Sequence, residues 1–132
     1  MMNKSKGFSL IELMITVAVL AIIVTVAIPS YRSYIERTNR TDGTRALMET
    51  AQALERCFSR FNAYNSNDCP VTFPITSDEG FYEITGQVQA GGFTLTATPQ
   101  GGQANDTRCA AFTLTHTQVR GVSGTATAED CW

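Results

Sequence analysis

The sequence is poor in the residues that most catalytic and metal sites require. His116 is the only histidine, which rules out a pair of histidines for metal binding or proton transfer. The four cysteines form no Cys-x-x-Cys motif and no cluster with histidine that would indicate zinc. We therefore predict no catalytic residue, no metal site and no cofactor, and we expect that the protein is not an enzyme.

The sequence also lacks an excess of basic residues. Twelve acidic residues stand against ten basic ones, for a formal net charge of −2. This balance excludes a general basic field that would hold nucleic acid or an anionic membrane surface by charge alone. The Gly-rich segment 100–103 lacks the strand-to-helix setting of a phosphate loop, and we interpret it as a turn. The acid pairs at 78–79 and 129–130 are most simply solvated, with calcium binding as the alternative.

One long apolar run is the main feature that the sequence does contain. It extends from Phe8 to Ile28, about 21 residues, and as a helix it would be roughly 32 Å long, which matches the hydrocarbon core of a bilayer. Lys4 and Lys6 precede the run without any acid, so the positive-inside rule places the N-terminus in the cytoplasm and the chain after Pro29 outside it. Helix-like sequence follows directly, which argues against an ordinary cleaved secretory signal.

The helical pattern continues beyond this run. Apolar residues recur with a period of about 3.6, first between Tyr31 and Thr38 and then between Leu47 and Phe61. We expect a helical spine from Phe8 to about Ala63. Pro29 removes an amide donor and should bend or loosen the spine, whereas the effect of Gly43 on its continuity stays open.

The C-terminal half has the pattern of β-strands. After a loop rich in Asn, Asp, Ser and Pro, the period changes to 2 in three short segments, at 81–89, 92–99 and 109–117. In the second segment Phe93, Leu95 and Ala97 share one face, and the intervening threonines share the other. These features predict an α+β fold, in which a long N-terminal helix, transmembrane in its first half, packs on a small antiparallel β-sheet.

All four cysteines lie beyond residue 56, on the side of the membrane where disulfides form. Three pairings are possible. Cys57 faces the core side of the predicted helix, and a bond to Cys69 would tie the end of the helix to the loop that leads into the sheet. Cys109 opens the third strand, and Cys131 lies in a tail with little apolar content. We predict the pairs Cys57–Cys69 and Cys109–Cys131. The second closes a loop of about 20 residues and should stabilise the folded state by roughly 3 kcal/mol.

The segment "KGFSLIELMITVAVLAIIVTVAIPSY", residues 6–31, combines several further features. A short basic leader ends in Gly7, Phe8 follows it, Glu12 lies inside the apolar run, and Pro29 comes at its end. This combination resembles the class III signal of the type IV pilins. The resemblance implies that a prepilin peptidase cuts between Gly7 and Phe8 and methylates the new amine of Phe8.

Glu12 needs an explanation, because an unpaired acid in the middle of a bilayer costs about 3 kcal/mol on insertion scales. The resemblance implies a partner for it. Cleavage creates a cationic amine at Phe8, and in a staggered bundle of subunits the amine of one subunit can meet Glu12 of the next. From its position alone Glu12 could instead lie near the membrane surface and extend toward water, and this alternative stays open.

The C-terminal half, "YEITGQVQAGGFTLTATPQGGQANDTRCAAFTLTHTQVRGVSGTATAEDCW", is similar to the C-terminal domain of the PilE-like minor pilins of Gram-negative bacteria. The strand with TLTATP, the turn from Asp106 to Cys109, the following strand and the closing Cys131-Trp132 carry this similarity. Ala110 departs from the pattern, because that class usually has glycine after the third cysteine.

The two resemblances imply the organisation of the chain: a class III leader at 1–7, a transmembrane and filament-core helix at 8–29, and a periplasmic pilin domain at 30–132. The expected function is that of a structural minor subunit of a type IV pilus, supporting pilus assembly, twitching motility, adhesion or DNA uptake. A major pilin or a type II secretion pseudopilin is the alternative within the class. A membrane-anchored periplasmic binding domain that does not polymerise is the alternative outside it.

The same resemblance implies the location and the partners. The chain should cross the inner membrane once, with its head in the periplasm, and later become part of the extracellular pilus. Its expected partners are the membrane, other pilin subunits, prepilin peptidase and the pilus assembly machinery of the inner membrane. DNA or a surface ligand is a further possible partner of the head.

Overall fold

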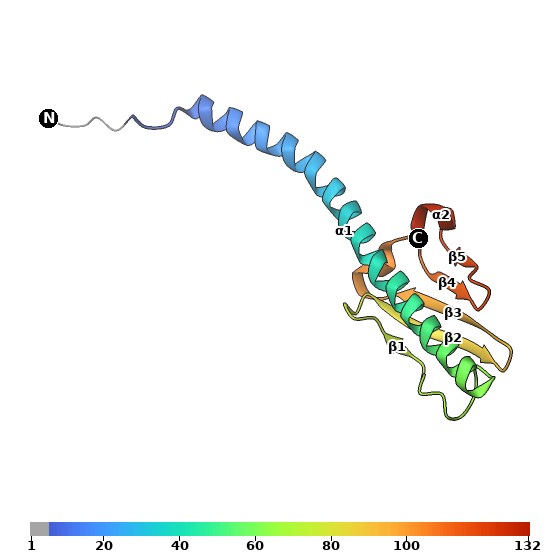
Figure 1. The fold of residues 1–132 in the computed structure, drawn as a ribbon. Coiled ribbons are helices and arrows are strands. Elements are labelled where there is room, and N and C mark those ends of the chain that lie inside the picture. The colour runs from blue at the N-terminus through green and yellow to red at the C-terminus, as the bar shows by residue number, and fades with distance from the viewer. Residues whose placement is uncertain (1–5) are drawn as a thin grey trace. The chain divides into compact units, whose positions relative to one another are not determined.

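The computed structural model describes residues 6–132, which form one long helix, a five-stranded sheet and two short helical elements (Figure 1). The chain divides into two compact units, one ending at Ile35 and the other comprising Glu36–Trp132, and we describe each by itself. The elements in chain order are α1 (Leu10–Phe61), β1 (Ile75–Thr76), β2 (Tyr82–Gln89), β3 (Gly92–Pro99), the 3-10 helix η1 (Gly101–Asn105), β4 (Phe112–Thr115), β5 (Arg120–Val122) and α2 (Ala128–Cys131).

Helix α1 is continuous through both residues that could have interrupted it, Pro29 and Gly43. Its 52 residues run from Leu10 to Phe61, so the helix begins slightly after the expected start at Phe8 and ends slightly before the expected end at Ala63. Asn62 follows with a φ of 56°, and its amide donates to the carbonyl of Phe58 at 2.8 Å. A residue in the left-handed region is a common way to end a helix, and asparagine adopts this conformation more readily than most residues.

Gly43 serves the packing of α1 rather than a break in it. A β-carbon at this position would lie 2.7 Å from Cγ of Tyr82, whose ring is fully buried on β2. Real β-carbons do not approach that closely, so a larger residue would push the helix away from the sheet. The cost of a glycine inside a helix, about 1 kcal/mol relative to alanine, is offset by this close contact.

The sheet is an antiparallel meander with the strand order β1-β2-β3-β4-β5. Strands β2 and β3 coincide closely with the first two expected segments. The third segment, expected at 109–117, is a strand only at 112–115, because Ala110 has a φ of 53° and turns the chain before β4 begins. Strands β1 and β5 were not predicted, since two and three residues are too few to show a period.

The globular part of the chain, which we call the head, has its hydrophobic core between the sheet and the part of α1 from Glu36 to Phe61. Phe93, Leu95 and Ala97 point into this core and are at most 3% exposed, whereas Thr94 and Thr98 on the other face of β3 are exposed. From α1, the core receives Leu47, Ala51 and Leu54. Burying each large aliphatic side chain contributes about 1.5–3 kcal/mol, so the packing of α1 on the sheet stabilises the head.

Two disulfides cross-link the head. One joins Cys57 on α1 to Cys69 in the following loop, and the other joins Cys109 before β4 to Cys131 in α2. These are the pairs expected from the sequence. Trp132 also holds the tail in place, because its indole nitrogen donates to the carbonyl of Gly121 at 3.1 Å.

A buried ion pair connects α1 to the loop after η1. Nε of Arg40 lies 2.6 Å from Oδ2 of Asp106, and Nη2 lies 2.9 Å from Oδ1. Burial raises the pKa of Asp106, but the hydrogen bonds from Arg40 and from the amide of Cys109 outweigh it and bring the pKa below its usual value. The hydrogen bond to Asp106 in turn raises the pKa of Arg40.

Replacing Ala110 by glycine should stabilise the head. A β-carbon in the left-handed region costs roughly 1–2 kcal/mol, and glycine avoids this cost while losing more chain entropy on folding. We expect Ala110→Gly to raise the free energy of unfolding by about 0.5–1 kcal/mol. Denaturant titration of the full chain in detergent measures the change. Ala111→Gly is the matched control and should lower the stability, since Ala111 does not have a positive φ.

The buried ion pair should make the head sensitive to acid. Because the pKa of Asp106 is lowered, the stabilisation is complete above the usual aspartate value of 3.8 and is lost as the pH falls from there through the folded pKa. At pH 7, Asp106→Asn should cost about 3 kcal/mol, because Arg40 then stays buried without a countercharge. The stability difference between the wild type and the variant, measured with urea, should shrink at pH 3. A stability difference that is the same at pH 3 as at pH 7 would contradict an ion pair between Asp106 and Arg40.

Candidate functional site

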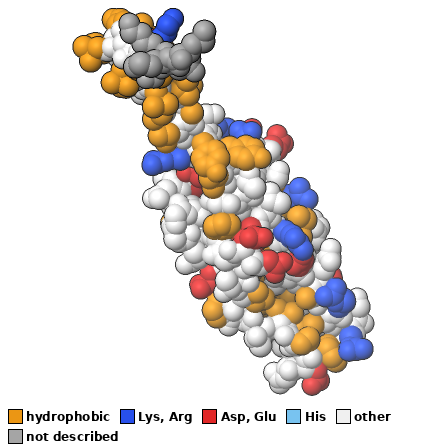
Figure 2. Space-filling view, turned by 90° about the vertical axis from the view of Figure 1, so that its left-hand side faces the viewer, with side chains coloured by type: hydrophobic (Ala, Val, Ile, Leu, Met, Phe, Trp, Pro, Cys, Tyr) orange, Lys and Arg blue, Asp and Glu red, His pale blue; other side chains and the backbone are white. Residues whose placement is uncertain are grey.

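The most unusual surface of the chain is the first half of α1. This stretch is long and apolar enough to cross a membrane, and none of it is buried within the chain. Hydrophobic side chains gather on it in the space-filling view (Figure 2). Its large apolar side chains are all at least 38% exposed, and five of them are between 61% and 76% exposed, namely Leu10, Ile11, Met14, Ile22 and Val26. A contiguous apolar surface of this kind needs a cover, either lipid or other protein.

Glu12 caps the N-terminal end of this helix. Its Oε2 accepts a hydrogen bond from the amide of Ser9 at 3.1 Å, while the carbonyl of Ser9 accepts the first helical bond, from Leu13, at 3.1 Å. Ser9 is thus the N-cap, and Glu12 lies at the third helical position, as in a capping box. This role was not predicted from the sequence, although the Ser-x-x-Glu spacing at 9–12 is a local signal for it.

Gly7 and Phe8 lie just before the helix. Both residues are exposed, Phe8 to 84%, and they belong to no regular element. A β-carbon on Gly7 would meet no atom within 4 Å. The peptide bond between them therefore lies outside the helical hydrogen bonds and is accessible to another protein. Lys4, in the leader before them, lies outside the described residues.

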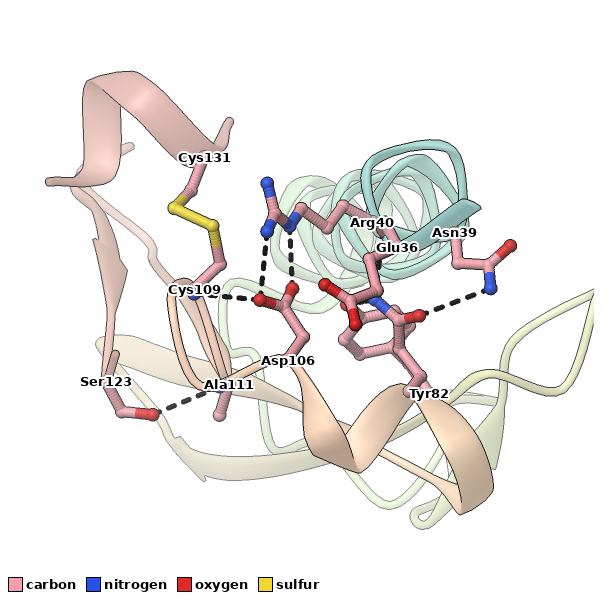
Figure 3. A network of polar contacts seen from close by, with 10 residues as sticks. Glu36, Asn39, Arg40, Tyr82, Asp106, Cys109, Ala111, Ser123 and Cys131 are labelled. Carbon is pink, nitrogen blue, oxygen red and sulfur yellow. Dashed lines mark hydrogen bonds and ion pairs between the residues drawn. A yellow bond between two sulfur atoms is a disulfide. The ribbon is translucent and has the colours of Figure 1, made fainter. Parts of the chain in front are cut away.

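The head contains a second polar site, where η1 meets α1 (Figure 3). Gln103 is buried and uses its whole side-chain amide there. Its Nε2 donates to the carbonyl of Glu36 and to the hydroxyl of Tyr82, both at 3.1 Å, and its Oε1 accepts from Asn39 at 3.2 Å. Burial raises the pKa of Tyr82 to about 12, although the hydrogen bond with Gln103 lowers this pKa by a smaller amount. The site was not predicted from the sequence, because its residues are far apart in the chain and no local pattern connects them.

The acidic loop at 78–79 is held by a structural contact. The carboxylate of Asp42 on α1 accepts hydrogen bonds from the amides of Glu79 and Phe81, at 3.1 and 3.2 Å, and from the hydroxyl of Ser77. Asp78 lies 3.8 Å from Arg45. Within residues 6–132, no group of three or more His, Cys, Asp or Glu side chains is placed to hold a metal ion.

His116 lies at the edge of an aromatic cluster. Its ring meets those of Tyr64 and Phe93 at centroid distances of 6.3 and 6.1 Å, and it covers Gly92, where a β-carbon would come within 2.8 Å of it. The position of the ring is thus explained by packing.

A groove of about 760 Å³ lies at the C-terminal end of α1, beside the Cys57–Cys69 disulfide. Arg56 and Arg60 line it and are both exposed. Their spacing of four residues places them on one face of the helix. Glu55 and Asp68 line the same groove, and Glu55 accepts a hydrogen bond from the hydroxyl of Tyr64 at 2.9 Å.

Comparison with protein families gives two matches. A family model described as the type IV minor pilin ComP, DNA uptake sequence receptor, matches residues 29–113. A model of the prokaryotic N-terminal methylation motif matches residues 2–28. Together the two cover the segment with Gly7, Phe8 and Glu12 and most of the head.

Individual relatives agree with these matches. The type IV major alpha-pilin of Moraxella bovis is 35% identical over 118 residues, which cover 79% of this chain and 74% of the relative. Prepilin peptidase-dependent protein D of Escherichia coli (strain K12) is 29% identical over 115 residues, 79% of each chain. The solved structure of the Neisseria meningitidis non-core minor pilin PilV has the same fold, with a TM-score of 0.57, 22% identity, and coverage of 70% of this chain and 91% of that one.

These findings come from different parts of the chain. The methylation-motif model covers residues 2–28, which include the start of α1, and the minor-pilin model covers more than half of the chain. The solved structure supports a long helix packed on a small antiparallel sheet. The chain therefore belongs to the type IV pilin family, in its minor-pilin branch, and is a structural subunit rather than an enzyme.

Proposed function

We propose that this chain is a minor subunit of a type IV pilus, held in the inner membrane before assembly and in the filament core afterwards by its N-terminal helix. The observation that carries the proposal is the apolar surface of α1, none of which is buried within the chain and which begins beside a single acid, Glu12. Residues 1–7 are the leader, 8–29 the membrane and filament-core helix, and 30–132 the head. The head lies in the periplasm first and on the extracellular pilus later.

The features expected of a prepilin peptidase substrate support this proposal. The match to the N-terminal methylation motif includes Gly7 and Phe8, and the bond between them lies exposed before the helix. One relative is named as a prepilin peptidase-dependent protein. Cleavage removes Lys4 and Lys6, which are the only lysines in the sequence. The amine of Phe8 is then the only amine of the mature chain.

Glu12 is the proposed partner of this amine in a neighbouring subunit. Its Oε2 accepts the hydrogen bond from Ser9, which leaves Oε1 for a second partner. In the apolar core of a filament, a hydrogen-bonded ion pair has a more favourable interaction energy than the same pair at a solvent-exposed surface. The pairing also removes the cost of a lone carboxylate among apolar side chains.

The alternatives differ from this proposal in what they predict for filaments. A major pilin would be abundant in sheared pili, and a type II secretion pseudopilin would depend on a secretion system rather than on pili. A membrane-anchored binding domain that does not polymerise would be absent from filaments, and its mature chain would keep the leader.

Two substitutions of Glu12 separate its charge from its capping role. Glu12→Gln keeps an oxygen for the amide of Ser9 but loses the charge, and Glu12→Val loses both. We expect both variants to insert in the membrane and to be cleaved before Phe8. Both should enter sheared filaments at least tenfold less than the wild type, since a charge-assisted hydrogen bond is worth about 1.5–3 kcal/mol. Quantitative mass spectrometry of sheared pili measures the amounts and the first residue.

A membrane-permeant carbodiimide gives a direct readout of the same contact. It joins a carboxylate to an amine only when the two touch, and the mature chain offers no lysine that would compete. A peptide joining the N-terminal amine of this chain to the corresponding glutamate of another subunit is expected from wild-type filaments. Normal incorporation of Glu12→Gln would contradict the pairing.

DNA binding by the head is a second candidate function. The matched family model is described as a DNA uptake sequence receptor. Arg56 and Arg60 line one groove on one face of α1, and within residues 6–132 neither forms an ion pair. Residues 36–132 contain seven arginines and eleven acids, a net charge of −4, so any contact with phosphates would have to be local to such a groove.

This second function is tested by fluorescence anisotropy with duplex DNA at several salt concentrations. Arg56→Gln with Arg60→Gln should weaken binding at least tenfold and lower the slope of log K against log salt by about 2, since each phosphate contact contributes about 0.9. Arg37→Gln, also an exposed arginine on α1, is the matched control and should bind normally. Equal binding by the double variant and the wild type would refute a role for this groove.

A further inference from the structure

The part of α1 inside the head is held in two different ways. Between Gly43 and Cys57 its buried side chains are mostly apolar and pack on the sheet. At Glu36, Asn39 and Arg40, at the N-terminal end of this part, the contacts to the η1 loop are hydrogen bonds and an ion pair. We call these polar contacts, with Gln103 and Asp106 as their centres, the η1 latch.

The latch is complete in its hydrogen bonds. Gln103 is 3% exposed and Asp106 is 2% exposed, and the partners of the Gln103 amide lie within bonding distance, from 3.1 to 3.2 Å. Asp106 accepts two bonds from Arg40 and a third, at 3.3 Å, from the amide of Cys109. Within residues 6–132, no buried side-chain nitrogen or oxygen is left without a partner.

The apolar contacts of α1 lie C-terminal to the latch. Between Glu36 and Asp42 the helix contributes no side chain to the apolar core, whose residues from α1 begin at Ala46, and Arg40 is the only buried residue in this stretch. The rotation of this end of the helix within the head therefore depends on hydrogen bonds, those of the latch and those that Asp42 accepts from the loop at 77–81. Hydrogen bonds are directional, and a shift of one residue rotates a helix by about 100°, which would break every bond of the latch at once.

The close-up shows the contacts between α1 and the η1 loop (Figure 3). Arg40 points toward Asp106, whereas Asn39 extends from another side of the same helix. The loop is itself fixed, because Cys109 donates to Asp106 and is joined to Cys131. Such buried polar groups are best attested as devices that set register.

We propose that Gln103 and Asp106 are positioning residues for assembly: they fix the rotation of α1 within residues 36–132, and so which side of residues 36–61 stays exposed to neighbouring subunits. This inference rests on the proposed function as a pilus subunit. The latch acts through the helix and touches no neighbour itself. Its loss should therefore impair incorporation into filaments far more than it impairs the folding of the head.

Replacing the polar side chains of the latch by apolar ones separates their effect on the rotation of α1 from their effect on the stability of the head. In one variant, Asn39→Leu, Tyr82→Phe and Gln103→Leu replace the amide contacts by side chains of similar size. In a second, Arg40→Met and Asp106→Asn remove both charges and keep an acceptor for Cys109. Replacing buried polar partners together by apolar groups is often nearly neutral for stability. We expect both full-length variants, in detergent, to melt within a few degrees of the wild type, but to enter sheared filaments at least fivefold less.

The matched control is Val122→Ala on β5, a partly buried core contact that belongs to no part of the latch. It should lower the melting temperature at least as much as the latch variants and leave incorporation close to the wild type. Incorporation that simply follows melting temperature across all variants would overturn the proposal, because the latch would then be structural only. If either latch variant fails to fold, the single change Gln103→Met is measured in the same way and decides the outcome.

This result is distinguishable from a failure of the proposed function. If the wild-type chain itself is absent from sheared filaments, the chain is not a pilus subunit under those conditions. If the wild type is present and a folded latch variant is incorporated equally well, the pilus assignment holds and only the positioning role is refuted.

Discussion

The structure depends on helix α1, whose two halves need different surroundings: the first half needs an apolar cover from outside the chain, and the second half packs on the sheet. From Leu10 to Ile28 the surface of α1 is apolar on all sides apart from Glu12, Thr16 and Thr25, and from Glu36 to Phe61 it is apolar on one side only. The second part gains its cover from the sheet of the same chain. The first part gains none, and only lipid or other subunits can supply it. The need for an outside partner is therefore built into the helix, whereas the head is self-sufficient.

The head is small, and its stability comes from several modest contributions. Its core is one layer of side chains between α1 and five short strands. A domain of this size buries too little apolar surface for a wide margin of stability, and cross-links are a common remedy. The disulfide between Cys109 and Cys131 holds a tail that contributes little to the core, and the Arg40–Asp106 pair holds the η1 loop. Specific polar contacts thus determine where each element lies.

The chemistry of this structure is that of assembly rather than of reaction. Its charged groups of interest, Glu12 and the Arg40–Asp106 pair, hold helices and loops in place. The outer face of β3, with Thr94 and Thr98, is polar but carries no charge. The groove with Arg56 and Arg60 is the local surface feature to which the proposed function assigns a further role.

The sequence by itself determined the features that depend on neighbouring residues. The apolar run, the change of period, strands β2 and β3 and the leader motif are all local patterns, which a chain shows whatever its tertiary structure. The Ser9–Glu12 cap belongs here too, because its spacing is local even though it was not predicted. Only the tertiary structure decided the role of Gly43, the shortened β4, the short strands β1 and β5, and the η1 latch. Arg40 and Asp106 are 66 residues apart, and Gln103 and Glu36 are 67 apart. No local pattern connects such residues, because their contact exists only once α1 has packed on the sheet.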